Sequence, residues 1–102
     1  MAERKLIVIA DPYTVYAFRM LGVEGYPVGN AEEARGVLRS LQSRRDVAIV
    51  FVSAELYDEL AGDIETLEKA NPSIVVSRLP TLREPGKPLD VQKELLRALG
   101  MG

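Results

Sequence analysis

Two residue types that carry much of protein chemistry are missing from this chain. None of its 102 residues is cysteine or histidine. The chain therefore has no disulfide, no thiolate nucleophile and no histidine phosphoacceptor, and it lacks the usual ligands of zinc. The absence of cysteine fits a reducing compartment such as the cytoplasm.

Long apolar runs and a strong net charge are missing as well. No segment approaches the roughly 20 apolar residues of a membrane-spanning helix, and the first apolar run is too short for a signal peptide. We therefore expect neither feature, and no direct insertion into a membrane. The chain has 13 Lys and Arg against 15 Asp and Glu, a net charge of −2. Since a nucleic-acid-binding surface needs excess positive charge, we expect no nucleic-acid partner.

The pattern of apolar residues predicts one α/β domain. The chain is 47% hydrophobic, enough for a core at this length. Apolar runs alternate with amphipathic stretches, which predicts strands at 6–10, 26–28, 47–52 and 73–79 and helices at 12–21, 31–43, 54–70 and 90–99. The helix over 54–70 runs through Gly62, a point at which it can break.

This alternation predicts a parallel sheet with helices on both faces, joined by right-handed crossovers. The most apolar strands, 6–10 and 47–52, belong at its centre, which gives the spatial order 2-1-3-4. Such a fold is a three-layer, receiver-like (flavodoxin-like) domain. We expect residues 1–80 to form it. Residues 81–102 are then a loop and a last helix, packed on the core or extending from it.

Three polar residues stand where helices begin, and we interpret them as N-caps. Asp11 precedes Pro12, which suits the first helical position. Asn30 is followed by Glu33 in the spacing of a capping box. Ser53 ends the third strand and precedes the third helix.

Asp11 and Ser53 also follow the two central strands, where α/β folds bind ligands. Receiver-type magnesium chemistry needs a second acid beside Asp11, an aspartate at the end of the third strand and a lysine near the end of a later strand, and none of these three positions is filled. Ser53 has no histidine to act as its base. We therefore predict no catalytic residue, no metal site and no cofactor.

One segment of the chain resembles a known family. From Ile7 to Gly25 it reads IVIADPYTVYAFRMLGVEG, which is similar to the N-terminal signature of the F subunit of archaeal and vacuolar rotary ATPases: an apolar strand, Gly/Ala-Asp, then T-V-x-G-F-R-L-A-G-V. Ala17 replaces the usual glycine, and Met20–Leu21 replaces Leu-Ala, which adds bulk. The matching residues are Asp11, Thr14, Val15, Phe18, Arg19, Gly22 and Val23.

Two further segments resemble the same family less specifically. VAIVFVSAELYDEL looks like its apolar strand followed by T/S-E-x-[IL], and IVVSRLPTLREPGKP looks like its fourth strand followed by a Gly/Pro loop. Length and element order also fit, so the resemblance covers nearly the whole chain.

The resemblance implies a non-catalytic part of the central stalk. Such a subunit binds the coiled-coil D subunit of the stalk and turns with it as a rotor, which couples ATP turnover in the A/B catalytic ring to proton or sodium transport. It lies at the cytoplasmic face of the cell membrane as a peripheral subunit. The segment after the fourth strand, here residues 81–102, would reach toward the A/B ring.

Two other functions are weighed against this one. A degenerate receiver-like signalling module would bind a kinase or regulator, but the chain has neither the acid pocket nor a DNA-binding output domain. A phosphotransferase-type enzyme or phosphocarrier would need a cysteine or histidine phosphoacceptor, which the chain lacks.

Sheet edges and neighbouring loops are natural docking places. We therefore expect the D subunit to contact the second strand and the end of the fourth strand with its loop, at residues Tyr26, Pro27, Arg78, Leu79, Leu82 and Arg83.

Overall fold

The computed structural model describes residues 4–79. The last predicted helix, 90–99, and the predicted division at residue 80 lie outside this part. Strands and helices alternate along the described chain, apart from two consecutive helices before the last strand. The elements are β1 (Lys5–Ala10), α1 (Pro12–Arg19), β2 (Glu24–Pro27), α2 (Ala31–Ser40), β3 (Val47–Ser53), α3 (Ala54–Tyr57), α4 (Ala61–Ala70) and β4 (Val75–Leu79).

The four strands form one parallel sheet in the order β2-β1-β3-β4, which confirms the predicted topology. The two central strands are the most apolar, and most of their residues are buried. In the register, Val8 of β1 lies between Gly25 of β2 and Phe51 of β3. Because the centre of the sheet is covered on both faces, these strands lack the usual alternation of apolar and polar residues.

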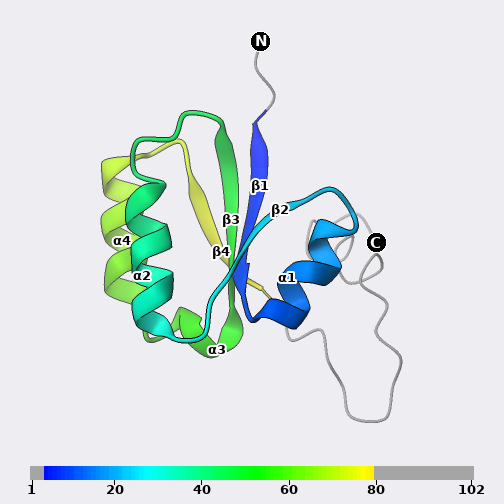
Figure 1. Ribbon diagram of the computed structural model, residues 1–102. Coiled ribbons are helices and arrows are strands. Elements are labelled where there is room, and N and C mark those ends of the chain that lie inside the picture. The colour runs from blue at the N-terminus through cyan, green and yellow to red at the C-terminus, as the bar shows by residue number, and fades with distance from the viewer. Residues whose placement is uncertain (1–3, 80–102) are drawn as a thin grey trace.

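Helices cover both faces of the sheet, as predicted, but unequally (Figure 1). The helices α2, α3 and α4 lie on one face over the larger core cluster. On the other face α1 contributes Val15 and Phe18, which pack with Val8, Phe51 and Leu79. Toward the amino ends of the strands, this second face is more open: Leu6, Val23 and Ile49 are partly buried and Val75 is 57% exposed.

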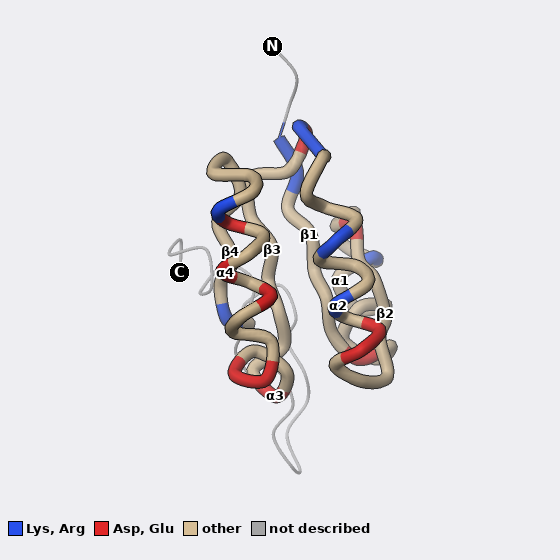
Figure 2. Tube along the Cα trace, turned by 90° about the vertical axis from the view of Figure 1, so that its left-hand side faces the viewer, with Lys and Arg blue, Asp and Glu red and all other residues tan. Residues whose placement is uncertain are grey.

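Charge is also distributed unevenly over the fold (Figure 2). Acidic residues lie along α3 and α4, whereas basic residues gather at the amino end of β1 and along the later turns of α2. The ion pair between Arg35 Nε and Asp63 Oδ2, 3.0 Å long, joins α2 to α4. Contacts of this kind are worth little at an exposed surface, so the apolar core stabilises the helix pair.

The first helix ends in a Schellman motif. Its last regular residue is Arg19, and Gly22 has a φ of 83°. The N–H of Val23 donates to the carbonyl of Phe18 at 3.2 Å, and the N–H of Gly22 donates to the carbonyl of Arg19 at 2.9 Å. This is the pattern in which a glycine stops a helix, because glycine adopts the left-handed conformation without strain. Gly22 therefore ends the helix predicted over 12–21.

The second helix begins as predicted and ends earlier. Asn30 Oδ1 accepts from the N–H of Glu33 at 2.9 Å, which confirms the cap. The Glu33 carboxylate accepts a hydrogen bond from the N–H of Gly29 at 2.5 Å. In a capping box it would accept from the N–H of the N-cap residue itself, Asn30. The helix ends at Ser40 instead of residue 43.

The prediction of one helix over 54–70 is wrong. The chain forms α3, a turn over residues 58–60, and then α4. Leu60 is fully buried, and its N–H donates to the carbonyls of Leu56 and Tyr57. Both helices face the same core, so the apolar spacing of three and four continues across the turn and hides it. The break precedes Gly62, which lies inside α4.

The predicted cap at Ser53 is also wrong. Ser53 precedes α3, but its side chain makes no capping hydrogen bond. Ser53 is also the last residue of β3, in register with Leu79 of β4, so it belongs to the sheet.

Candidate interaction surface

Asp11 follows the carboxyl end of β1 and caps α1. Its Oδ2 accepts from the N–H of Thr14 at 3.0 Å, and its Oδ1 accepts from the hydroxyl of Thr14 at 2.6 Å. Partial burial acts to raise the pKa of Asp11, but the hydrogen bonds from Thr14, together with those from the backbone of Asp11 and Tyr13, lower the pKa. The interpretation of Asp11 as a helix cap is confirmed.

Within residues 4–79 no three His, Cys, Asp or Glu side chains gather closely enough to hold a metal ion. None of the helices in this part of the chain has the length and apolar character needed to cross a membrane.

A polar network fixes the β2 edge of the sheet. The half-buried Tyr26 packs on the larger core, and its hydroxyl donates to Glu24 Oε2 at 2.6 Å. Arg44 binds the same carboxylate at 2.7 Å and Asp46 Oδ2 at 2.7 Å. The Nζ of Lys5 lies 3.6 Å from each acid. The hydrogen bond from Arg44 lowers the pKa of Glu24 to about 2, so the network carries its charges throughout the neutral range.

The backbone of β2 is poorly suited to pairing with another strand. Arg19 Nη2 donates to the carbonyl of Gly25 at 2.9 Å, which occupies an acceptor at the outer edge. Pro27 has no N–H to donate. A partner at this edge would therefore meet side chains, because these backbone groups cannot extend the sheet.

The β4 edge is partly closed in the same way. The N–H of Val76 donates to Glu68 Oε2 at 3.0 Å. Arg78 is exposed, donates to Asp58 Oδ1 at 2.6 Å, and lies 5.1 Å from the centre of the Tyr57 ring. Leu79 is only 2% exposed.

The structure does not bring the predicted contact residues into one patch. Tyr26 and Pro27 lie on β2, whereas Arg78 and Leu79 lie on β4, with β1 and β3 between them. Three strand spacings separate these edges by roughly 14 Å. The other two predicted residues, Leu82 and Arg83, lie outside the described part of the chain.

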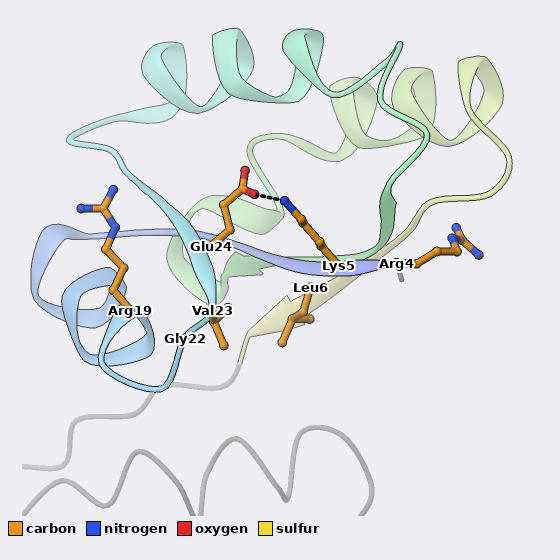
Figure 3. A pocket seen from close by; sticks show the side chains of 7 residues that line it. All are labelled: Arg4, Lys5, Leu6, Arg19, Gly22, Val23 and Glu24. Atoms are coloured by element: carbon orange, nitrogen blue, oxygen red, sulfur yellow. Dashed lines mark ion pairs between the residues drawn. The ribbon is translucent and has the colours of Figure 1, made fainter. Parts of the chain in front are cut away.

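A hollow that the sequence reasoning missed lies beside β2, and we call it the α1–β2 notch. Its volume is about 600 Å³. It exists because pairing of β1 with β2 starts at Ile7 and Glu24, so the first two residues of β1 project beyond β2. Figure 3 shows Leu6 and Val23 pointing to the same side. The lining residues are Arg4, Lys5, Leu6, Arg19, Gly22, Val23 and Glu24.

The cations of the notch differ in how they are neutralised. Lys5 lies beside Glu24 and Asp46. Arg4 donates to the carbonyls of Val47, at 2.8 Å, and of Ser73, whereas Arg19 donates to a carbonyl and lies 5.5 Å from the Tyr16 ring centre. Among the described residues neither arginine has a carboxylate partner; Arg4 binds carbonyls on the β3 and β4 side of β1, and Arg19 binds one on β2.

Two exposed apolar residues precede Gly22, one of the residues that line the notch. Met20 is 87% exposed and Leu21 is 42% exposed, and both immediately precede Gly22. The stripe that buries α1 uses Val15 and Phe18, so it does not account for them. In the sequence, this apolar pair outside the buried stripe of α1 was the one signal that pointed to a surface feature here. The hollow itself depends on the β1–β2 register, which the sequence does not reveal.

Comparison with known proteins agrees with this fold. A family model described as ATP synthase (F/14-kDa) subunit matches residues 6–95. The F subunit of the V-type ATP synthase of Thermus thermophilus is 35% identical over 95 residues, which cover 90% of this chain and 91% of the relative. The F subunit of the A-type ATP synthase of Methanosphaera stadtmanae is 37% identical over 76 residues, covering 72% and 71%.

A solved structure extends the likeness to three dimensions. The crystal structure of the F subunit of the V-type ATP synthase of Archaeoglobus fulgidus has a TM-score of 0.57 at 26% identity, covering 74% of this chain and 98% of that one. The resemblance carried by the segment from Ile7 to Gly25 is confirmed. The chain therefore belongs to the family described as ATP synthase (F/14-kDa) subunit, whose matching relatives are the F subunits of V-type and A-type ATP synthases.

Proposed function

We propose that this chain is a non-catalytic rotor subunit in the central stalk of an archaeal or vacuolar-type rotary ATPase. It binds the coiled-coil D subunit and turns with it, and so couples ATP turnover in the A/B ring to proton or sodium transport. The complex holds it at the cytoplasmic face of the membrane as a peripheral subunit. The observation that carries the proposal is the family match over residues 6–95.

The state of the carboxyl edge supports a binding role. In a receiver-type domain the acid after the first strand would serve a metal ion, but here both oxygens of Asp11 accept hydrogen bonds from Thr14. The residue stabilises α1. We propose that the described domain serves to bind its partners in the complex, and that ATP turnover takes place in the A/B ring.

Side chains at the two sheet edges supply the proposed contacts with the D subunit. Pro27 and the network around Tyr26 present a fixed surface on β2, and Arg78 presents an exposed cation on β4. Leu79 supports that end of β4 from within the core. We retain Leu82 and Arg83 as proposed contacts, and residues 81–102 as the segment directed to the A/B ring.

Co-expression with the D subunit that the same genome encodes, followed by size-exclusion chromatography with mass determination, tests the proposal. We expect a stable heterodimer with one copy of each chain. Elution of the folded chain alone would contradict the stalk assignment and would favour a receiver-like protein-binding module.

A further inference from the structure

The guanidinium of Arg78 on β4 is held by two neighbouring residues at the end of α3. Its Nη2 donates to Asp58 Oδ1 at 2.6 Å, and Asp58 is the residue that follows the last turn of α3. Its Cζ lies 5.1 Å from the centre of the Tyr57 ring, which is within the range of a cation–π contact. The short helix therefore fixes a cation of the edge strand from two sides.

Both supports of Arg78 are themselves anchored in the core. Tyr57 is partly buried and packs against the larger core cluster, so its ring is a fixed platform for the guanidinium. The next residue of β4, Leu79, is buried on the opposite face of the sheet and holds the backbone beside Arg78. The guanidinium therefore has a defined position although 51% of the Arg78 side chain is exposed.

We propose that Tyr57 positions Arg78 to bind a carboxylate of the coiled-coil D subunit, and that Asp58 occupies the guanidinium until this carboxylate replaces it. The proposal rests on the proposed function, in which Arg78 is a contact of the β4 edge. It adds two residues of α3 to that contact, and it specifies the sign of the charge that the partner brings.

The ring contact leaves Arg78 able to bind a carboxylate. A guanidinium has five N–H donors in its plane, and within residues 4–79 the Arg78 side chain donates only to Asp58. Stacking on Tyr57 uses the face of the group and keeps its in-plane donors free for a bidentate bond. Because the ring already restricts the side chain, less conformational entropy is lost when the partner binds.

The ion pair with Asp58 is of a kind that a partner can replace. The Asp58 side chain is 79% exposed, and an exposed ion pair contributes little to folding stability. The Asp58 carboxylate can therefore return to water at little cost. A carboxylate that meets Arg78 inside a contact from which water is excluded interacts with it more strongly, since the effective dielectric constant is lower there.

The first test is a titration of the full chain with the purified D subunit. Tyr57→Leu removes the ring, whereas Tyr57→Phe retains it and is the matched control. We expect Tyr57→Leu to raise Kd by about two- to fivefold, the size of an exposed cation–π contact, and Tyr57→Phe to keep the wild-type Kd. Thermal unfolding of each free variant checks that the fold is intact.

A double-mutant cycle separates positioning from a structural role of Tyr57. Arg78→Ala should raise Kd by about tenfold or more, because the partner carboxylate loses its cation. In the Arg78→Ala background, Tyr57→Leu should have no further effect, since the ring acts through the guanidinium. An equal rise in Kd with and without Arg78 would show that Tyr57 acts independently of it and would overturn the proposal.

A change at Asp58 should have the opposite sign. Asp58→Asn removes the competing charge, so Kd should fall by about two- to fivefold. The matched control is Asp63→Asn, because Asp63 forms the comparable ion pair with Arg35 at 3.0 Å and lies on α4; it should leave Kd unchanged. An unchanged or higher Kd of Asp58→Asn would overturn the exchange of carboxylates.

Failure of this proposal can be told from failure of the proposed function. If the wild type does not bind the D subunit, the proposed function fails. If the wild type and Arg78→Ala bind it equally well, the proposed function stands and the role of Arg78, with its support by α3, is overturned.

Discussion

Arg44 binds Glu24 across 20 positions of sequence: its Nη1 donates to Oε2 of the glutamate at 2.7 Å. The same guanidinium donates to Asp46 at the start of β3. One side chain therefore joins the edge strand β2 to the turn that leads into a central strand. Arg44 also donates to the Tyr26 hydroxyl at 3.1 Å and so helps to orient it.

The first prediction concerns pH. The hydrogen bond from Arg44 lowers the pKa of Glu24 from 4.5 to about 2 and that of Asp46 from 3.8 to about 2. Because these pKa values are lower in the folded state, their contribution to stability is present above about pH 4.5 and is lost as pH falls toward 2. Urea unfolding of the wild type should show this loss. In Arg44→Met we expect lower stability at pH 7 and a flatter decline; an unchanged slope would contradict the network.

The second prediction concerns Gly25, where β2 passes close to Val15 of α1. A Cβ at this position would lie 2.7 Å from Cγ1 of Val15, a fully buried and stiff side chain. Gly25→Ala should therefore destabilise the protein by about 1–3 kcal/mol through overpacking. Gly36 in α2 has no atom within 4 Å of its Cβ position. Gly36→Ala is the control and should stabilise by about 0.5–1 kcal/mol. Equal effects of the two changes in chemical denaturation would refute the close contact.

The third prediction concerns Asp11. As a cap, it should tolerate asparagine, whose side-chain oxygen still accepts from the N–H of Thr14, whereas Asp11→Ala should cost about 1 kcal/mol. If the residue instead served a metal ion, Mg²⁺ would raise the Tm of the wild type and not that of Asp11→Asn. We expect no effect of Mg²⁺ on either protein in thermal unfolding.

The sheet could be predicted from the sequence because its signals are local. Uninterrupted apolar runs at 6–10 and 47–52 belong in a buried parallel sheet, and their greater hydrophobicity placed them at the centre. Caps at Asp11 and Asn30 were equally readable, since a cap is a contact between neighbours in sequence.

The helix break and the notch were missed because they depend on contacts between residues far apart in the sequence. Leu60 keeps the helical spacing of Leu56 and Ile64, yet the chain turns there to bury it in the shared core. The notch arises from the offset between β1 and β2, which tertiary packing sets. Neither feature leaves a periodic signal, so only the three-dimensional structure reveals them.

The fourth prediction concerns the β4 edge. Arg78→Glu combined with Arg83→Glu should weaken capture by the D subunit and leave the isolated fold intact. The ion pair of Arg78 with Asp58 is exposed, with 51% and 79% of the side chains accessible, so its loss costs little stability. Co-purification checks the result, and undiminished recovery of the coiled coil would remove this edge from the interface.

The rotor assignment can be tested most directly by cross-linking within the assembled ATPase. The chain has no cysteine, so a cysteine introduced at an exposed position such as Met20 or Glu65 gives a single point of attachment. If the chain turns with the D subunit, a covalent link between the two should leave ATP hydrolysis running. A link to the A/B ring should stop hydrolysis until it is reduced. Arrest by the link to the coiled coil, or continued hydrolysis with the link to the A/B ring, would contradict the account.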